Sequence, residues 1–377
     1  MSAGAGTELE GRDWPELAAM DVASRVDQVR QTMAEDSIEI MIVTKSENVR
    51  WLTGFTGSNG RLVVTHDAFI AITDGRYREQ ITNQLDQAGV AATIEITTTE
   101  VGDILAAAIA PQARVGLEAN HVTWKDKDQM VSWLPERELI PLDAMIEELR
   151  KLKDQGERAR LAQAAAIADL ALAEVEPLLA LGPTERAVAQ YLDNLMADLG
   201  ADEPSFETIV ASGPNSAMPH ASPRGRVIEP RDLVIIDIGA RVDGYGSDMT
   251  RTFVAGGTFS AEQARWYNAV AEAQAAGIDV VSDGVEIRSV DAACREVLAE
   301  HGLADAFVHS TGHGIGLEIH EDPILSARTD GILRAGYVVT VEPGVYLPPV
   351  GGVRIEDSVV VEDTGCQPIT LSPKTAP

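Results

Sequence analysis

Short runs of hydrophobic residues in the first third of the chain predict β-strands. β-Branched residues dominate these runs, and turn-forming residues bound them. The predicted strands cover residues 38–45, 61–65, 68–73, 92–97 and 113–118. Two intervening segments, residues 75–85 and 101–110, carry hydrophobic residues at helical spacing. Strands that alternate with helices indicate a small α/β domain with a mixed or parallel sheet.

Residues 144–180 form a long helical stretch in which charged residues mix with recurring Leu, Ile and Ala. Because glycine weakens the interior of a helix, we expect Gly156 to interrupt this stretch. The interruption places a domain boundary near Leu152. The sequence therefore predicts an N-terminal domain over residues 1–152 and a larger second domain over residues 153–377.

The second half of the chain combines helices with short strands. Strands are predicted within residues 232–255, amphipathic helices over residues 261–281 and 287–301, and further short strands toward the end. Helices beside antiparallel hairpins indicate an α+β domain. We expect the residues after Leu371 to fray, as unpacked chain ends do.

Composition and charge exclude several classes of protein. The chain has 45% hydrophobic and 24% charged residues, which is typical of globular proteins and not of disordered or membrane proteins. Its 59 acidic residues outnumber 30 basic ones, and the resulting charge of -29 repels nucleic acid and anionic membranes. The two cysteines suggest neither a disulfide framework nor a thiolate metal site. The first residues lack the pattern of a secretory signal, so we expect a cytoplasmic protein.

A predicted hairpin brings two carboxylates to one face of a sheet. Asp243 and Gly244 are typical of the two-residue turn of a β-hairpin. If they form the turn, Gly239 lies opposite Asp248, and Asp237 points to the same face as Asp248. Diagonal neighbours of this kind have Cβ atoms roughly 7 Å apart, a spacing that a pair of cations could bridge.

Three of the seven histidines lie within twelve residues, at positions 309, 313 and 320. Gly312 and Gly314 flank His313 and remove side-chain bulk around it, so His313 is the candidate metal ligand. His309 and His320 suit hydrogen bonding or proton transfer at a reacting carbonyl.

Two glutamates lie in strand-like segments near the end of the chain. Glu342 interrupts an apolar strand, and burying an unpaired carboxylate costs several kcal/mol, so a cation or a proton must accompany it there. Arg354 and Glu356 are two residues apart and therefore share a face of a strand.

Each of these signals has an ordinary structural explanation when it is taken alone. Asp supports turns through its own side chain, single histidines are often satisfied structural residues, and Glu356 and Arg354 suit a half-solvated strand or a surface ion pair. Taken together, four carboxylates and one imidazole are the ligand set of a two-metal site. Such a site can generate hydroxide at neutral pH and polarise a carbonyl.

These segments resemble the metallopeptidase family with the pita-bread fold, which comprises prolidase, aminopeptidase P and methionine aminopeptidase. The positions that match the family's metal ligands are Asp237, Asp248, His313, Glu342 and Glu356. The resemblance also implies substrate-binding or catalytic roles for His220, His309, His320, Tyr346 and Arg354. Residues 48–60 and 73–77 resemble the creatinase-like N-terminal domain of the proline-specific members, which methionine aminopeptidases lack.

The resemblance implies a smaller α/β creatinase-like domain followed by an α+β pita-bread catalytic domain, with an antiparallel sheet and flanking helices. It implies two divalent ions per chain, Mn²⁺ first and Co²⁺ or Zn²⁺ as alternatives, and hydrolysis of the bond before proline in di- or oligopeptides. Glu342 would pass a proton to the leaving nitrogen, while His220 and His320 would hydrogen-bond the substrate or the developing oxyanion. A homodimer is expected on the same ground.

The resemblance leaves the type of peptidase open. Prolidase takes dipeptides and aminopeptidase P takes longer peptides, yet both share these motifs. The short interval between Glu342 and Glu356 favours prolidase, which also needs a cation for the carboxylate of proline, with Arg354 and Arg328 as candidates. A non-catalytic binding protein and a metal-free creatine amidinohydrolase are remote alternatives, because relatives of these kinds lack metal ligands that this sequence keeps.

Overall fold

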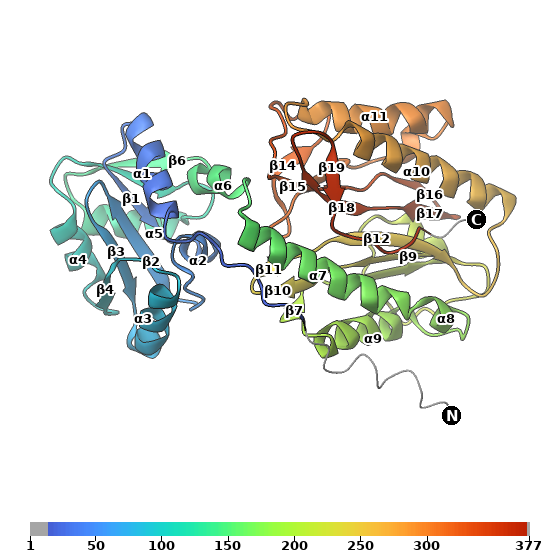
Figure 1. The fold of residues 1–377 in the computed structure, drawn as a ribbon, viewed down its shortest axis with the longest axis horizontal. Coiled ribbons are helices and arrows are strands. Elements are labelled where there is room, and N and C mark those ends of the chain that lie inside the picture. Colours follow the sequence, from blue (N-terminus) through green and yellow to red (C-terminus); the bar gives the residue numbers. More distant parts are fainter. Residues whose placement is uncertain (1–13, 375–377) are drawn as a thin grey trace. The chain divides into compact units, whose positions relative to one another are not determined.

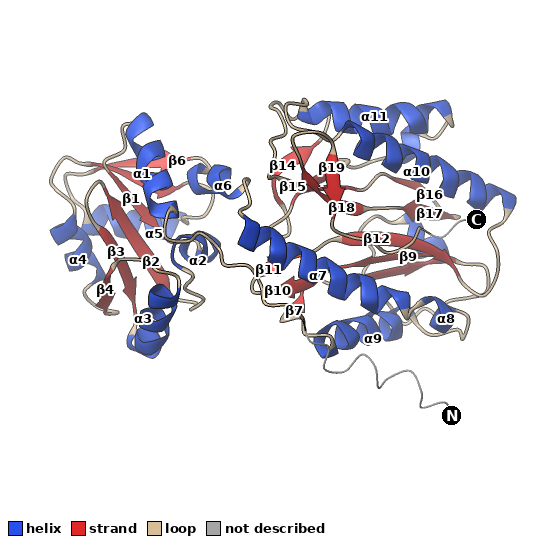
Figure 2. Cartoon of the chain, in the orientation of Figure 1, coloured by secondary structure: helices blue, strands red, loops and turns tan. Residues whose placement is uncertain are grey.

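The computed structural model describes residues 14–374 and divides the chain into two compact units (Figures 1 and 2). The N-terminal unit covers residues 19–150. The second unit begins at residue 151 and also includes residues 14–18. The absence of a secretory signal was inferred from residues that lie mostly outside the described range.

The N-terminal unit contains a six-stranded sheet in the order β4-β3-β2-β1-β5-β6. Its strands are β1 (Ile40–Val43), β2 (Gly60–Thr65), β3 (Phe69–Thr73), β4 (Thr93–Ile96), β5 (Arg114–Glu118) and β6 (Glu138–Leu142). The pairs β1–β2 and β2–β3 are antiparallel, whereas β3–β4, β1–β5 and β5–β6 are parallel. The prediction of an α/β domain with a mixed sheet is therefore confirmed.

Sequence reasoning missed β6, which contains Pro141. Proline cannot donate a ladder hydrogen bond, and it is tolerated here because β6 is an edge strand. The helices of this unit are α1 (Arg25–Glu35), α2 (Ser46–Thr53), α3 (Arg78–Gln87), α4 (Val101–Ala108), α5 (Trp124–Trp133) and α6 (Met145–Arg150).

The helical stretch at the boundary is interrupted before Gly156 and not at it. Residues 151–154 separate α6 from α7 (Gln155–Ala173), and Gly156 is buried in the first turn of α7. Asp154 ends the interruption because its carboxylate accepts a hydrogen bond from the Glu157 amide at 2.8 Å, while Glu157 bonds back to the Asp154 amide. This capping box, and not a glycine, sets where the helix begins.

Every strand pair described in the second unit is antiparallel, which confirms the α+β prediction. The first group of strands comprises β7 (Glu203–Pro204), β8 (Ile209–Ser212), β9 (Leu233–Ile238), β10 (Ala240–Val242), β11 (Tyr245–Gly246) and β12 (Met249–Val254). The second group comprises β13 (Gly312–Gly314), β14 (Glu321–Leu325), β15 (Val338–Val341), β16 (Gly344–Leu347), β17 (Gly351–Arg354), β18 (Asp357–Val361) and β19 (Cys366–Pro368).

Two hydrophobic cores cover these strands from opposite sides. One core joins α7, α8 (Glu176–Leu179) and α9 (Glu185–Asp198) to β9 and β12. The other joins α10 (Ala261–Val280) and α11 (Ile287–Glu300) to the later strands. Figure 1 shows α7 and α9 along one side of this unit and α10 and α11 along the other. Along β9, Val234 and Ile236 face the α7–α9 core, whereas Ile235 packs against Tyr346. Side chains alternate between the two faces of a strand. Polar side chains of β9 that lie on the same face as Ile235 therefore point away from the α7–α9 core, into the space between the two cores.

Residues 372–374 are held in place, so the prediction of a frayed end is wrong for them, and the rest of the predicted frayed end lies outside the described residues. The amides of Leu371 and Ser372 each donate to the Asp169 carboxylate at 2.8 Å. Lys374 forms an ion pair of 2.9 Å with Asp357. Side-chain partners supplied by α7 and β18 were not visible in the local sequence.

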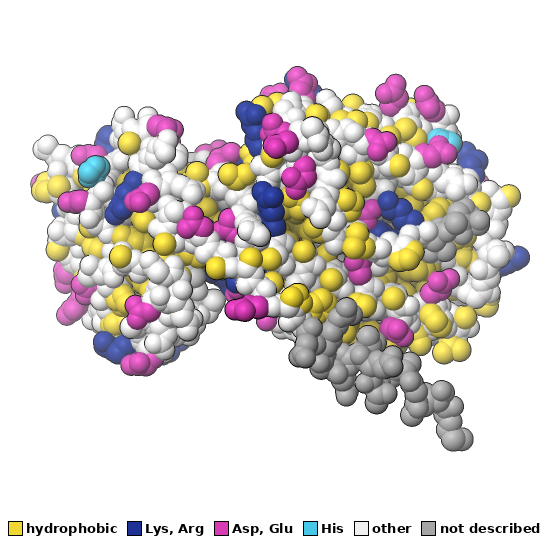
Figure 3. Space-filling model, viewed as in Figure 1, with side chains coloured by type: hydrophobic (Ala, Val, Ile, Leu, Met, Phe, Trp, Pro, Cys, Tyr) yellow, Lys and Arg dark blue, Asp and Glu magenta, His cyan; other side chains and the backbone are white. Residues whose placement is uncertain are grey.

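The acidic excess of the sequence is spread over the protein. In Figure 3, Asp and Glu side chains occur over much of the visible surface without gathering into one cluster. Among the described helices, none combines the length and hydrophobicity that crossing a membrane requires.

Candidate active site

The predicted hairpin is present and sets the register of its strands. Asp243 and Gly244 form the turn with φ of 44° and 80°, and Val242 pairs with Tyr245 across it. Positive φ at both turn positions is what a tight hairpin of this type requires. The same register continues to Asp237, which lies opposite Thr250. Asp237 and Asp248 consequently face one cavity, as predicted.

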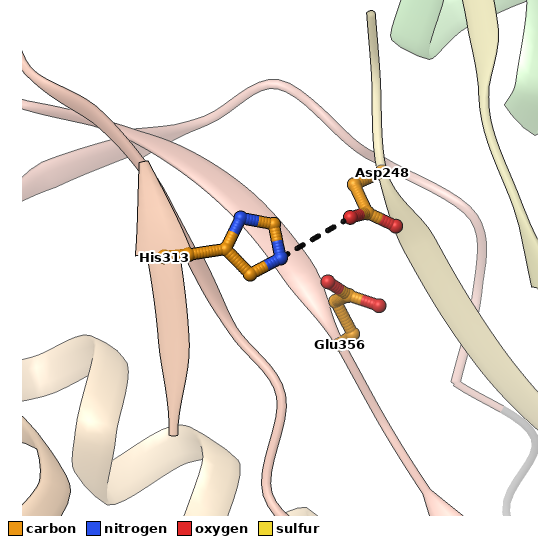
Figure 4. Close-up of side chains that lie close together, drawn as sticks. All are labelled: Asp248, His313 and Glu356. Carbon is orange, nitrogen blue, oxygen red and sulfur yellow. Dashed lines mark ion pairs between the residues drawn. The ribbon is translucent and has the colours of Figure 1, made fainter. Parts of the chain in front are cut away.

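Asp248, His313 and Glu356 bring their ligand atoms together in the interior. One such atom from each residue lies within 4.8 Å of the others (Figure 4). The residues come from separate places: Asp248 precedes β12, His313 is in β13, and Glu356 lies between β17 and β18. Glu342 completes the group, since its carboxylate and that of Asp248 each lie 3.5 Å from Nε2 of His313.

The glycines around His313 let β13 fit between its neighbours. A Cβ at Gly312 would lie 2.0 Å from the Thr340 carbonyl oxygen, and one at Gly314 would lie 2.4 Å from that of Asp322. The carbonyl of Gly314 accepts a hydrogen bond of 3.0 Å from Nδ1 of His313. Because a carbonyl can only accept, Nδ1 carries the proton and Nε2 presents its lone pair to the carboxylates.

The carboxylates of this group repel one another. Burial is the main cause that raises the pKa of Asp248 and Glu356, and neighbouring carboxylates raise both further. Burial likewise raises the pKa of Glu342 to about 8, although Arg354 opposes the shift. Burial lowers the pKa of His313 to about 4 and keeps the imidazole neutral.

Among the described residues that line this cavity, two have a buried oxygen atom without a hydrogen-bond partner: Oδ1 of Asp237 and Oε1 of Glu356. Buried polar atoms are otherwise nearly always paired. One guanidinium, that of Arg354, accompanies five carboxylates in the cavity, those of Glu207, Asp237, Asp248, Glu342 and Glu356. Missing partners, excess negative charge and a donor set of oxygen and nitrogen are what divalent cations would satisfy. The residues therefore fit a metal site.

Arg354 connects the carboxylates to two further predicted site residues. It donates to Asp237 at 2.6 Å and to the Tyr346 hydroxyl at 2.9 Å. The Tyr346 hydroxyl lies 2.9 Å from Nε2 of His309, whose Nδ1 lies 2.8 Å from the Ser310 carbonyl. Since the carbonyl only accepts, Nδ1 of His309 donates and Nε2 accepts from Tyr346. Burial lowers the pKa of His309 to about 4, which is consistent with a neutral ring.

The cavity that contains these groups has a volume of about 260 Å³. Eight of the predicted site residues line it: His220, Asp237, Asp248, His313, His320, Glu342, Arg354 and Glu356. His309 and Tyr346 do not line it and are connected to it through Arg354. The other arginine candidate, Arg328, does not line it either. The individual roles of these residues as ligands or substrate contacts stay predictions.

Sequence reasoning missed several residues that build the site. Phe206, Ile209 and Ile319 form an apolar part of the cavity wall. Thr250 donates to Glu356 at 2.7 Å and accepts from Nε of Arg354 at 3.0 Å. Its place two residues after Asp248, on the same face of the hairpin, was a usable signal.

A buried ion pair behind the site was also missed. Arg251 is 1% exposed, donates to the carbonyl of Glu356, and forms an ion pair of 2.7 Å with Asp357. Its Nη2 also donates to the Ser372 carbonyl at 2.7 Å. Because Arg251 holds the carbonyl of Glu356 and Asp357 follows Glu356 in sequence, the pair fixes the backbone that carries Glu356. No periodicity in the sequence indicates that Arg251 is buried.

Comparison with known proteins places the chain in a family. Residues 159–363 match the model of metallopeptidase family M24, and residues 25–152 match the creatinase/prolidase N-terminal domain. The uncharacterized peptidase YqhT of Bacillus subtilis is 40% identical, with 93% of this chain and 98% of that protein aligned.

Two solved structures show the same architecture. The Xaa-Pro dipeptidase of Bacillus anthracis is 37% identical with a TM-score of 0.89, covering 93% of this chain and 98% of that one. The X-Pro aminopeptidase of Thermotoga maritima is 31% identical with a TM-score of 0.84, covering 93% and 99%. The chain therefore belongs to metallopeptidase family M24, as an enzyme with a creatinase-like N-terminal domain and a pita-bread catalytic domain.

Proposed function

We propose that this protein is a dinuclear-metal peptidase that hydrolyses the Xaa-Pro bond, preferentially in dipeptides. In this proposal residues 1–152 form the N-terminal domain and residues 153–377 form the catalytic domain. The observation that carries it is the buried group of carboxylates around His313, with two unpartnered oxygen atoms inside one cavity. The names of the Bacillus anthracis and Thermotoga maritima relatives support the choice of a proline-directed peptidase.

Five residues would hold the metal ions: Asp237, Asp248, His313, Glu342 and Glu356. Their oxygen and nitrogen donors suit Mn²⁺, with Co²⁺ and Zn²⁺ as alternatives. When bound, a pair of such ions supplies a hydroxide nucleophile at neutral pH and polarises the carbonyl of the substrate.

The protein side chains would handle protons and orient the peptide. Glu342 would take up a proton and release it to the leaving nitrogen. His220 and His320 would donate hydrogen bonds to the carbonyl oxygen as negative charge develops on it. Arg354 would contact the substrate in the cavity, and Tyr346 and His309 would contribute to substrate binding through the hydrogen bonds that join them to Arg354.

His320→Ala tests the proposed histidine roles. His320 lies at the rim of the cavity, with its ring 4.5 Å from that of His313, and makes no hydrogen bond with a described side chain that the change would break. We expect kcat for an Xaa-Pro dipeptide to fall by about 100-fold, the range for loss of a positioned donor, while the thermal unfolding midpoint stays unchanged. Steady-state kinetics measure the effect. Turnover within a few-fold of wild type would exclude His320 from the chemistry.

A comparison of substrates separates the two peptidase types. We expect kcat/KM for Met-Pro to exceed that for Met-Pro-Ala by at least about tenfold, which corresponds to about 1.4 kcal/mol of discrimination. The assay uses the Mn²⁺-loaded protein with both peptides under identical conditions. Efficient cleavage of the tripeptide would instead support an Xaa-Pro aminopeptidase. Cleavage of neither peptide would contradict both.

The proposal extends to a cytoplasmic homodimer, an expectation that rests on the family resemblance. Light scattering on the purified protein would test it, since a monomer at micromolar concentration would contradict a stable dimer.

A further inference from the structure

Helix α11 carries a pair of charged residues that contact residues 307–311, the segment leading into β13 and His313. Asp291 is fully buried, and Arg295, one turn further along, forms an ion pair of 2.7 Å with it. The second carboxylate oxygen of Asp291 accepts a hydrogen bond of 2.8 Å from the Thr311 hydroxyl. Both oxygen atoms of this buried carboxylate therefore have a partner, one in the Arg295 guanidinium and the other in the Thr311 hydroxyl.

Arg295 holds the segment that carries His309. Its guanidinium donates to the Phe307 carbonyl at 3.1 Å and to the His309 carbonyl at 2.6 Å. The same guanidinium lies 4.3 Å from the centre of the Phe307 ring. Residues 307–310 belong to no helix or strand, and Arg295 supplies the carbonyls of Phe307 and His309 with the donors that a neighbouring strand would otherwise provide.

The contacts continue from the backbone to the His309 ring. That ring packs edge-on against Phe307, with centroids 5.0 Å apart, and lies 5.5 Å from the Tyr346 ring. It also accepts a hydrogen bond from the Tyr346 hydroxyl, and Tyr346 in turn accepts one from Arg354. A shift of the His309 backbone would therefore displace Tyr346 and the guanidinium that holds Asp237.

We propose that Asp291 and Arg295 form a clamp that sets the position and tautomer of His309, and that both are positioning residues for the peptidase reaction. Neither touches the cavity, so they would act through His309. The inference rests on the proposed Xaa-Pro peptidase function for its kinetic consequence. Its structural part, the fixed His309 ring, is independent of that function.

The kinetic test uses Arg295→Met, with Arg295→Lys as a conservative variant and Arg288→Met as a matched control. Arg288 is on the same helix but exposed, and it pairs only with exposed carboxylates. We expect Arg295→Met to lower kcat/KM for Met-Pro by roughly 10- to 100-fold, the range for losing a partner that orients a metal-site residue. Lysine cannot form the same fork of contacts, so Arg295→Lys should have a kcat/KM between those of wild type and Arg295→Met. Arg288→Met should match wild type.

Each variant is then combined with His309→Ala. If the clamp acts through His309, Arg295→Met should lower kcat/KM by no more than about twofold once the histidine is absent. An equal loss in both backgrounds, or no loss in either, would overturn the inference. Wild-type turnover by His309→Ala would overturn it too, while leaving the proposed peptidase function intact.

A second readout needs no turnover. In the metal-free protein labelled with ¹⁵N-histidine, long-range ¹H–¹⁵N spectra report which ring nitrogen carries the proton, and the His309→Ala spectrum identifies the resonance. We expect a single Nδ1–H form in wild type and Arg288→Met, and a mixture in Arg295→Met. An unchanged spectrum in Arg295→Met would contradict the clamp, whether or not the protein cleaves Xaa-Pro peptides. Failure to cleave any Xaa-Pro peptide would refute the proposed function separately.

Discussion

Replacing Glu342 with Gln is expected to lower kcat for Met-Pro by about a thousandfold, within the range for removing a general acid–base. The amide can neither accept the proton nor deliver it to the leaving nitrogen. The fold should persist, because burial already raises the pKa of Glu342 to about 8 and leaves the carboxyl protonated at pH 7 in the metal-free protein. Glutamine closely matches that neutral form in shape. Single-turnover kinetics with Mn²⁺ present measure the effect.

The control for this variant is Glu296→Gln. Glu296 is an exposed residue of α11 and does not line the cavity. It should show wild-type kcat and the same unfolding midpoint. The Mn²⁺ content of Glu342→Gln must be measured as well, because Glu342 is also a proposed ligand. A variant that keeps both ions and turns over at close to the wild-type rate would remove Glu342 from the chemistry.

Asp248→Asn should lower the Mn²⁺ content clearly below two ions per chain and reduce kcat/KM by at least about a hundredfold, the upper end of the loss for a metal-site partner. Asp248 is buried near three other carboxylates, so its charge is tolerable only beside a cation. The metal-free variant should unfold at a temperature no lower than that of metal-free wild type, since the change removes a repelled group. Elemental analysis and calorimetry test the two statements.

Asp305→Asn provides the matched change at an exposed position outside the cavity, and it should alter neither metal content nor activity. Two ions bound to Asp248→Asn, with wild-type turnover, would show that the carboxylate is not a ligand. A metal-free variant that unfolds far below wild type would mean that Asp248 supports the fold instead.

The part of the site that follows from local geometry could be predicted from the sequence. The turn at Asp243 and Gly244 fixes the hairpin register, and the register alone brings Asp237 and Asp248 to one face. The glycines beside His313 predicted a close approach of the backbone. The neighbouring strands do lie that close, since a Cβ at either glycine would collide with one of their carbonyl oxygens.

What the sequence could not give depends on packing between distant segments. Arg251 and Asp357 are buried together although neither lies in a pattern that predicts burial. The prediction of an interruption at Gly156 rests on helix propensity, which is a local property. In the structure the interruption is at residues 151–154, where the Lys153 amide donates to the Gly336 carbonyl at 3.0 Å, in a turn far along the chain. The contact between the His309 ring and the Tyr346 hydroxyl, two residues 37 positions apart, has no signal in the local sequence either.

The anchoring of residues 371–374 ties the integrity of the site to a segment far from it in sequence. Arg251 holds Ser372 and Glu356 with one guanidinium, and Lys374 shares Asp357 with it. A premature stop codon or proteolytic trimming before Ser372 would leave a buried cation with fewer acceptors directly behind a proposed ligand. Loss of Ser372 and Lys374 would thus affect the region where catalysis is expected, far from the lesion in sequence.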